Sequence, residues 1–228
     1  MYRIGMATIG QSPRDDLVPY MQQVFTKPVE ILQKGCLDNL GPQEIASFGP
    51  DPGEVGIVAR LRDGTSTLLS HAKVLPRMQT VVDELMEQGA EFVVVLCGAD
   101  WTGIKSSRLV VNPGRVFPAV VSSLAIGRRL GIIKPSAGQV DKERERYAQM
   151  GIEAVVTSAN PYGGAARLES AREAANYLKS HDVDLVWMTC VGMDTPMRAV
   201  VEEVVGKPII LARTILSRIV DELIPNRT

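Results

Sequence analysis

Two short apolar runs, far apart in the chain, each end on a cysteine. The first is residues 91–97, Glu-Phe-Val-Val-Val-Leu-Cys, and the second is residues 184–190, Asp-Leu-Val-Trp-Met-Thr-Cys. Small or turn-prone residues follow each cysteine, and an apolar run bounded in this way is typical of a fully buried parallel strand. Ligands of open α/β sheets bind at the carboxyl ends of such strands. We therefore predict that Cys97 and Cys190 lie at strand ends and face a ligand cleft.

The composition argues against nucleic acid and membrane as partners. The 228 residues carry a net charge of −1, and only 5% are aromatic, so neither a basic field nor a stacking surface for bases is expected. No apolar run approaches the roughly 18 residues of a membrane helix, and the N-terminal apolar run is too short for a signal peptide. We therefore expect a soluble cytoplasmic protein with a core of ordinary size.

The cysteines and histidines are too few and too scattered to predict a metal site. Cys36, Cys97 and Cys190 show no CxxC spacing, and only His71 and His181 could add imidazole ligands. No glycine-rich nucleotide motif is present either. We therefore expect no metal ion and no nucleotide, and we interpret Cys36, in a loop-like stretch after a strand, as a bystander.

Strand and helix patterns alternate through almost the whole chain, which predicts an α/β architecture with largely parallel sheets. A hairpin is predicted around Asp63-Gly64, since this dipeptide lies between two β-rich runs. The proline-rich and glycine-rich stretch 113–118 is interpreted as a loop. Strands are predicted at 2–9, 28–34, 91–96, 130–134, 152–157, 183–189 and 207–211, and helices at 12–25, 42–47, 71–88, 116–127, 139–150, 168–180, 196–205 and 212–223.

This pattern repeats coarsely in the two halves. Each half opens with a strand that ends in a turn containing serine, glutamine and proline, and each later has a strand that ends in cysteine. We therefore predict two pseudo-symmetric three-layer α/β domains. The first comprises residues 1–110 with 206–228, because the closing strand and helix are expected to return to it, and the second comprises residues 111–205. The active-site cleft is expected between them.

Several polar residues are candidates for holding a ligand, and each has a purely structural alternative. Ser12 is a good N-cap with Pro13 after it, so a helix N-terminus near Thr8 and Arg14 predicts either an anion site or simply a well-capped helix. Arg115 is either a clamp on a substrate carboxylate or a solvated loop arginine. Asn160 either holds the substrate or shapes its glycine-rich turn. Asp100 and Trp101 are expected to line the mouth of the cleft.

Three segments carry a resemblance to a known family. The stretch Thr-Ile-Gly-Gln-Ser-Pro-Arg-Asp at 8–15, the stretch Asn-Pro-Gly-Arg-Val-Phe-Pro-Ala at 112–119 and the segment around Cys190 resemble the AroM protein family over essentially the full chain. That family is similar to the aspartate/glutamate racemase superfamily, which includes amino-acid and hydantoin racemases, maleate isomerases and arylmalonate decarboxylases. The resemblance implies two α/β domains with a site between them, no pyridoxal phosphate or other cofactor, and one site cysteine per half, at Cys97 and Cys190. Superfamily relatives commonly dimerise, so a homodimer is among the states that the resemblance implies.

The residues after both cysteines depart from the racemase pattern. Racemases usually have Asn-Thr after the first cysteine, where this chain has Gly98-Ala99, and often Thr-His after the second, where it has Val191-Gly192. The missing histidine removes a usual acid/base helper. The fold therefore transfers from the resemblance better than the reaction does.

The first hypothesis is a cofactor-independent racemase or isomerase that acts on a small carboxylic acid or an amino-acid-like compound. One cysteine would remove a proton from one face of a carbon, the other would return a proton to the opposite face, and nearby N–H and O–H groups would stabilise the enolate. The alternatives are a non-catalytic binding or sensing protein, or a one-cysteine decarboxylase or cis–trans isomerase on the same fold. The candidate binding residues are Thr8, Gln11, Ser12, Arg14, Gly98, Ala99, Arg115, Thr157, Asn160, Val191 and Gly192.

Overall fold

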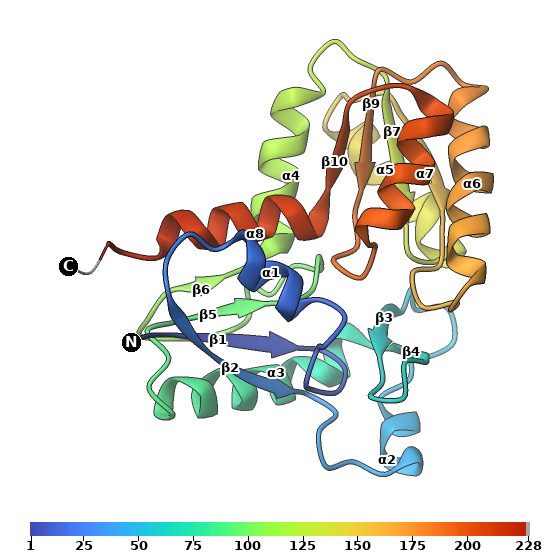
Figure 1. Ribbon diagram of the computed structural model, residues 1–228. Coiled ribbons are helices and arrows are strands. Elements are labelled where there is room, and N and C mark those ends of the chain that lie inside the picture. Colours follow the sequence, from blue (N-terminus) through green and yellow to red (C-terminus); the bar gives the residue numbers. More distant parts are fainter. Residues whose placement is uncertain (227–228) are drawn as a thin grey trace. The chain divides into compact units, whose positions relative to one another are not determined.

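The computed structural model describes residues 1–226 and divides the chain into two compact units (Figure 1). The first unit comprises Met1–Gly114 and the chain from Leu216 onward, and the second comprises Arg115–Ile215. Each unit has its own parallel sheet and its own buried apolar cluster. The predicted α/β class with two sheet-and-helix halves is thereby confirmed.

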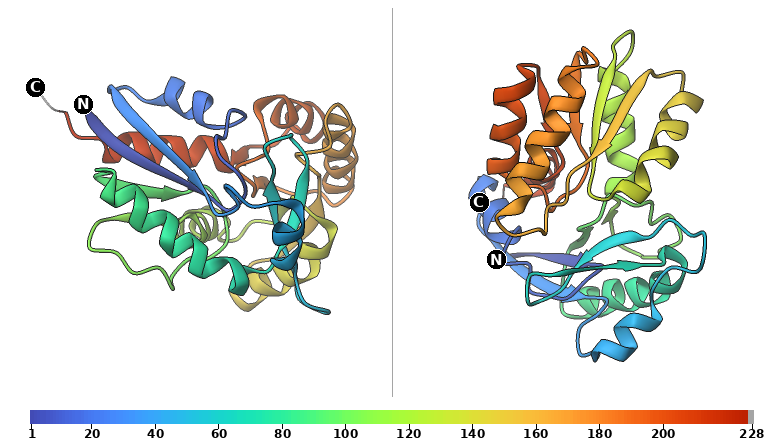
Figure 2. Two further views of the ribbon diagram at one scale, coloured as in Figure 1. Left: turned by 90° about the horizontal axis from the view of Figure 1, so that it is seen from below. Right: turned by 90° about the vertical axis from the view of Figure 1, so that its right-hand side faces the viewer.

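The first unit is built on a four-stranded parallel sheet in the order β2-β1-β5-β6. Of its inner strands, β5 is wholly buried and apolar, and β1 is buried from Ile4 to Thr8. Helix α3 packs on one face of this sheet, and α1 and the end of α8 lie on the other (Figures 1 and 2). The elements of this unit are β1 (Tyr2–Thr8), α1 (Val18–Val24), β2 (Val29–Gly35), α2 (Pro42–Ser47), the antiparallel hairpin β3 (Ile57–Arg60) and β4 (Ser66–Leu69), α3 (His71–Glu87), β5 (Phe92–Val95) and β6 (Val110–Val111).

The second unit has a parallel sheet in the order β10-β9-β7-β8. Helices α6 and α7 pack against each other on one face, and α4 and α5 lie on the other (Figure 2). The elements of this unit are α4 (Pro113–Leu124), β7 (Leu130–Lys134), the 3-10 turn η1 (Ala137–Gln139), α5 (Val140–Gln149), β8 (Ala154–Ser158), α6 (Ala166–Lys179), β9 (Leu185–Met188), α7 (Thr195–Val205), β10 (Ile209–Leu211) and α8 (Ala212–Leu223), which crosses into the first unit.

The two sheets have the same topology. In each, the first strand lies beside the second on one side and beside the third on the other, and the fourth lies beyond the third. Successive strands are therefore added first toward one edge of each sheet and then toward the other. The change occurs between the first and third strands, which are β1 and β5 in one unit and β7 and β9 in the other. This switch point is where parallel α/β sheets place ligands, at the carboxyl ends of the strands.

The predicted domain boundary near residue 206 differs from the structure. Strand β10 pairs in parallel with β9, with Ile209 opposite Val186, so residues 206–215 belong to the second unit and only the later part of α8 joins the first. The cause is local: Gly206 ends α7 in the left-handed conformation at φ 65°, and the chain returns at once to the same sheet as a strand–helix–strand unit does.

Two local predictions were wrong. The first helix begins at Val18 rather than near Ser12, with Leu17 at its N-cap, and the Ser12–Pro13 peptide bond is cis. The stretch 113–118 is not a loop but the first turns of α4. Pro113 opens the helix, where its missing N–H has no partner to lose, and Pro118 lies inside the helix. Within the described residues, none of the helices is long and apolar enough to span a bilayer.

Candidate functional site

Cys97 and Cys190 occupy equivalent places in the two sheets. Cys97 lies two residues beyond the end of β5 and Cys190 two residues beyond the end of β9, the third strand of each sheet. Both side chains are partly exposed. The prediction that each of these cysteines follows a buried parallel strand is therefore confirmed.

The backbone around the two sulfurs is also equivalent. The Ala99 N–H donates to Cys97 Sγ over 3.5 Å, and the Gly192 N–H donates to Cys190 Sγ over 3.4 Å. In each loop the donor is thus two residues after the cysteine. Such a donor stabilises negative charge on sulfur, because a hydrogen bond to an ionised acceptor is stronger than one to a neutral acceptor.

Cys36 differs from both. It follows β2, the edge strand, and is fully buried with its sulfur 3.9 Å from Met78 Sδ. Burial raises the pKa of the Cys36 thiol far above its ordinary value, and the Arg77 guanidinium only partly offsets this. Cys36 is therefore a neutral core thiol at physiological pH.

The Cys97 loop is held by neutral groups where the chain passes from β6 into the first turn of α4. Asn112 Oδ1 accepts from the Trp101 N–H at 3.2 Å, and its Nδ2 donates to Asp100 Oδ1 at 2.9 Å. Gly114 packs directly on the loop backbone, since a Cβ there would lie 2.1 Å from the Ala99 carbonyl oxygen. Trp101 is buried against His71, with ring centroids 4.5 Å apart, so it belongs to the core and not to a cleft mouth.

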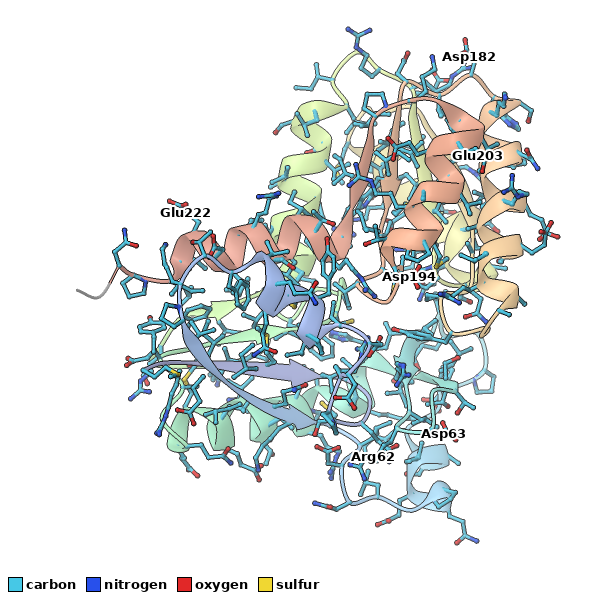
Figure 3. All side chains as sticks on the ribbon, viewed as in Figure 1. Arg62, Asp63, Asp182, Asp194, Glu203 and Glu222 are labelled. Carbon is cyan, nitrogen blue, oxygen red and sulfur yellow. The ribbon has the colours of Figure 1, made fainter. Side chains whose placement is uncertain are left out.

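The Cys190 loop is held by charged groups. The buried Arg213 guanidinium, at the start of α8, donates to the Val191 and Gly192 carbonyl oxygens at 3.1 and 3.0 Å. At the far end of the loop, Asp194 caps α7 by accepting from the Met197 N–H at 2.9 Å (Figure 3). Asp194 also pairs with Arg167 Nε at 2.9 Å. Both ends of the loop are thereby fixed.

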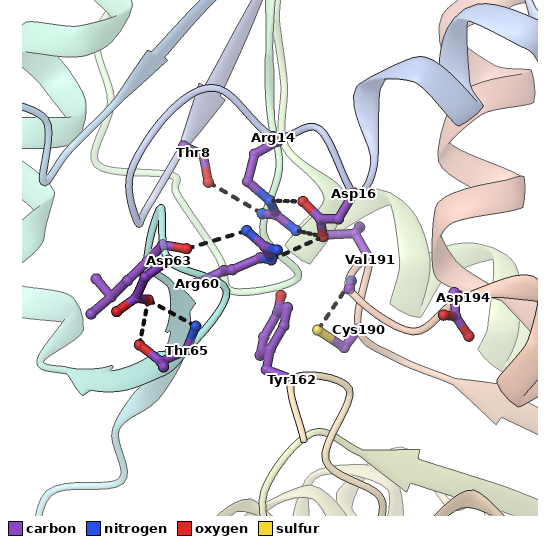
Figure 4. Close-up of polar contacts among 12 residues, drawn as sticks. Thr8, Arg14, Asp16, Arg60, Asp63, Thr65, Tyr162, Cys190, Val191 and Asp194 are labelled. Atoms are coloured by element: carbon purple, nitrogen blue, oxygen red, sulfur yellow. Dashed lines mark hydrogen bonds and ion pairs between the residues drawn. The ribbon is translucent and has the colours of Figure 1, made fainter. Parts of the chain in front are cut away.

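The loop after β8 brings a tyrosine to the Cys190 loop. Asn160 Oδ1 accepts from the Tyr162 N–H at 2.9 Å. The Asn160 side chain therefore shapes the turn, which was one of the two roles that the sequence predicted for it. The Tyr162 ring lies against Gly192, and Figure 4 shows it next to the Cys190 side chain. Thr157, at the end of β8, is half-buried.

In the first unit, the predicted anion site at Thr8 and Arg14 is an internal ion-pair cluster. The buried Arg14 guanidinium makes two 2.8 Å contacts with Asp16 and donates to Thr8 Oγ1 at 3.3 Å (Figure 4). Arg60 of β3 approaches Asp16 at 3.7 Å. The Arg14 charge is therefore balanced by Asp16, and the helix N-terminus that the prediction relied on begins later in the chain.

Ser12 and Gln11 bind other loops rather than cap a helix. The Ser12 N–H and Oγ donate to the Asp38 carboxylate at 2.8 and 2.5 Å, and Gln11 Oε1 accepts from the Arg62 N–H at 2.8 Å. The loop after β1 is thereby tied to the loop after β2 and to the β3–β4 hairpin. Arg115 is exposed in the first turn of α4.

Sequence reasoning missed several residues that shape these loops. Asp16, Asp38, Arg60, Tyr162 and Arg213 all act through contacts with residues distant in the chain or in other loops, which no spacing rule indicates. Lys134 had a usable signal, because it ends the apolar run of β7 at the switch point of the second sheet. It forms a 3.3 Å ion pair with the nearly buried Glu143 of α5.

The sequence profile of the family described as "AroM protein" matches residues 4–224. The chain belongs to the AroM protein family. No curated protein sequence matches it. The predicted family membership is therefore confirmed over nearly the whole chain.

Solved structures with the same fold as this AroM family member include racemases. Allantoin racemase from Klebsiella pneumoniae has a TM-score of 0.62 at 15% identity, with 98% of this chain and 87% of that chain covered. The aspartate racemase of Picrophilus torridus has a TM-score of 0.60 at 11% identity, covering 98% and 94%. Glutamate racemase from Aquifex pyrophilus has a TM-score of 0.58 at 16% identity, covering 98% and 84%. At these identities the likeness establishes the racemase-like fold, and the reaction has to be argued from the site.

Proposed function

We propose that this protein is a cofactor-independent racemase or isomerase for a small carboxylic acid or an amino-acid-like compound, with Cys97 and Cys190 as its two acid/base groups. One observation carries the proposal. Two partly exposed thiols follow the third strand of two sheets with identical topology, and each sulfur accepts a backbone N–H from the residue two positions on. A repeated thiol in a repeated setting fits a reaction that needs the same group twice.

The chemistry is a proton transfer at a carbon next to a carboxylate. One cysteine, as thiolate, takes the proton and becomes a thiol, while the electron pair moves into an enolate. The other cysteine, as thiol, gives its proton to the opposite face and becomes a thiolate. Turnover therefore exchanges the protonation states of the two sulfurs, and the next turnover runs in the reverse sense. Arg115 and Thr157 remain our candidates for binding the carboxylate.

The test is isotope exchange with a panel of chiral carboxylic acids, amino acids and ureido acids in D₂O. Wild-type protein should incorporate deuterium at the α-carbon of one panel member and racemise it, as followed by NMR and chiral chromatography. Cys97→Ser and Cys190→Ser should each lower racemisation about 10³-fold, since a general acid or base contributes about 10²–10⁴-fold. Cys36→Ala should retain it. Wild-type racemisation in either serine variant would rule out the two-base reaction.

A binding or sensing protein is the second candidate. Gly98, Ala99, Val191 and Gly192 bring no polar side chain next to either thiol, which favours it. A binding protein would be stabilised against heat by a panel member without exchanging its α-proton. A one-cysteine decarboxylase or cis–trans isomerase would instead lose activity in only one of the two serine variants.

A further inference from the structure

The Tyr162 phenol occupies the space that a side chain at residue 192 would fill. A Cβ built on Gly192 would lie 2.2 Å from the Tyr162 hydroxyl oxygen and 2.6 Å from its Cζ. Real Cβ atoms do not approach so closely, so only glycine fits at residue 192 while the phenol is in this position. The N–H of the same glycine donates to Cys190 Sγ. The hydroxyl therefore lies against the residue whose backbone contacts the thiol.

Both partners of this contact are held in place. Tyr162 is fixed by the Asn160 turn, and the Asn160 N–H is itself 3.2 Å from Ser170 Oγ on α6. Gly192 is fixed by the buried Arg213, which binds its carbonyl oxygen at 3.0 Å. The loop after β8 and the loop after β9 thus hold the backbones of Tyr162 and Gly192, and this arrangement places a phenol beside a thiol.

A phenol beside a nucleophilic or basic sulfur has a clear chemical use. Phenols titrate near pH 10 in water, so at neutral pH a phenol is a hydrogen-bond donor rather than a base. Hydrogen-bond donors help a reaction most when they are already aimed at the place where negative charge develops. The four residues that follow the two cysteines supply only backbone donors, whereas Tyr162 supplies a side-chain donor.

From this geometry we propose that Tyr162 is a catalytic residue: its hydroxyl donates to an anionic oxygen of a ligand whose reacting carbon sits at Cys190 Sγ. This inference rests on the proposed function in taking a carboxylate-bearing compound as the ligand. The inference goes beyond the proposed function because it names the side chain of the second unit that donates to the carboxylate or enolate oxygen.

Two alkylating reagents of the same size test the assignment. Iodoacetate and iodoacetamide both react by attack of sulfur on a CH₂ carbon, with formation of the C–S bond and loss of iodide, but only iodoacetate carries a carboxylate beside that carbon. Rates at Cys190 are measured peptide by peptide by mass spectrometry in the folded full-length protein. Tyr162→Phe keeps the ring over Gly192 and removes only the hydroxyl.

Tyr162→Phe should slow iodoacetate at Cys190 at least about tenfold, because a hydrogen bond to a charged group contributes at least about 1.5 kcal/mol, and should change iodoacetamide less than about twofold. Tyr177→Phe, which removes a phenol hydroxyl from α6 in the same unit, should change neither rate. No change in Tyr162→Phe, or an equal change with both reagents, would overturn the assignment, since a purely structural role affects both reagents alike.

Gly192→Ala provides a second route to the same result. The added methyl group should push the phenol aside, so Gly192→Ala alone should reproduce the selective loss of iodoacetate reactivity, and adding Tyr162→Phe should cause no further loss. Additive losses would contradict the contact. Alkylation needs no turnover, so this test and the racemisation test fail separately. An unchanged ratio of the iodoacetate and iodoacetamide rates would contradict only the role of Tyr162. Racemisation by a variant without Cys97 would contradict only the two-base reaction.

Discussion

The Cys97 loop and the Cys190 loop have the same place and the same N–H to sulfur contact, but different interactions hold them. A neutral amide, Asn112, and the close backbone packing of Gly114 hold the Cys97 loop. A buried guanidinium, Arg213, and the Asp194 helix cap hold the Cys190 loop. The shared geometry therefore follows from the topology, because a buried third strand ends at that point in each sheet. Different neighbouring side chains stabilise the same geometry in the two units.

Cys36 shows that strand position matters as much as residue type. It also follows a parallel strand, but that strand is the second of its sheet and lies at the edge. Its thiol is directed into the core, next to Met78. Of these positions, only those after the third strands have partly exposed sulfurs.

The largest expected effect comes from the same Cys→Ser change at all three positions. At Cys97 and Cys190 the substitution should lower the racemisation rate about 10³-fold. It should lower the free energy of unfolding by less than about 1 kcal/mol, because water reaches both side chains. At Cys36 it should leave the rate intact but lower stability by about 1–3 kcal/mol, since it buries a hydroxyl without a partner. Turnover assays and urea unfolding measure the two effects. A stability loss at Cys97 equal to that at Cys36 would break the distinction.

The next effect separates the two ways of holding the loops. Arg213→Met should lower the free energy of unfolding by about 3 kcal/mol, because it strips two buried carbonyl oxygens of a charged donor, whereas Asn112→Leu should cost about 1–2 kcal/mol. Urea denaturation checks both values. Arg213→Lys serves as the control that keeps the charge but loses the fork of donors. Equal costs for Arg213→Met and Asn112→Leu would show that charge plays no special part in the Cys190 loop.

A smaller difference is expected between two glycines. Gly114→Ala should cost about 2 kcal/mol, because the methyl group meets the backbone of Ala99, while Gly192→Ala should cost less than about 1 kcal/mol, because it meets the movable end of Tyr162. Thermal and urea unfolding of the two alanine variants give the comparison. A reversed order would mean that the Cys190 loop is the more tightly packed of the two.

The smallest effect is a dependence of stability on pH that isolates Cys36. Burial in the folded state raises the pKa of this thiol above its ordinary value of 9.0, so its contribution is complete below pH 9 and is lost as the unfolded thiol ionises at higher pH. Wild-type protein should therefore lose about 1.4 kcal/mol per pH unit above about pH 9 relative to Cys36→Ala. Urea unfolding of both proteins at pH 8 and pH 10 measures the difference. Parallel curves would contradict a buried Cys36 thiol.

The sequence predicted the elements well where the apolar pattern was long or the punctuation strong. Helix α3, the Asp63-Gly64 hairpin and the strands before both cysteines were found near their observed bounds. The start of α1 was misplaced because Ser12 satisfies every local rule for an N-cap while its side chain is used by Asp38 in another loop. Strand β10 was assigned to the wrong unit, because strand pairing is a long-range choice that three residues do not encode.

The sequence placed the two candidate thiols after buried strands, but it missed the residues that surround them. Cys97 and Cys190 follow from apolar runs and were found. The sequence showed that the histidine often found after the second cysteine of racemases is absent, with Gly192 in its place. It did not show that Tyr162, thirty residues upstream, fills that space, because only the turn of the β8 loop brings the two together.

The most direct test of the equivalence of the two loops needs no substrate. Folded protein is treated with iodoacetamide near neutral pH, and the alkylation rate of each cysteine is followed by peptide mass spectrometry. We predict that Cys97 and Cys190 react within about tenfold of each other and at least about 100-fold faster than Cys36, which reacts only after local unfolding. If either Cys97 or Cys190 reacts as slowly as Cys36, the two loops are not equivalent and the two-cysteine account is wrong.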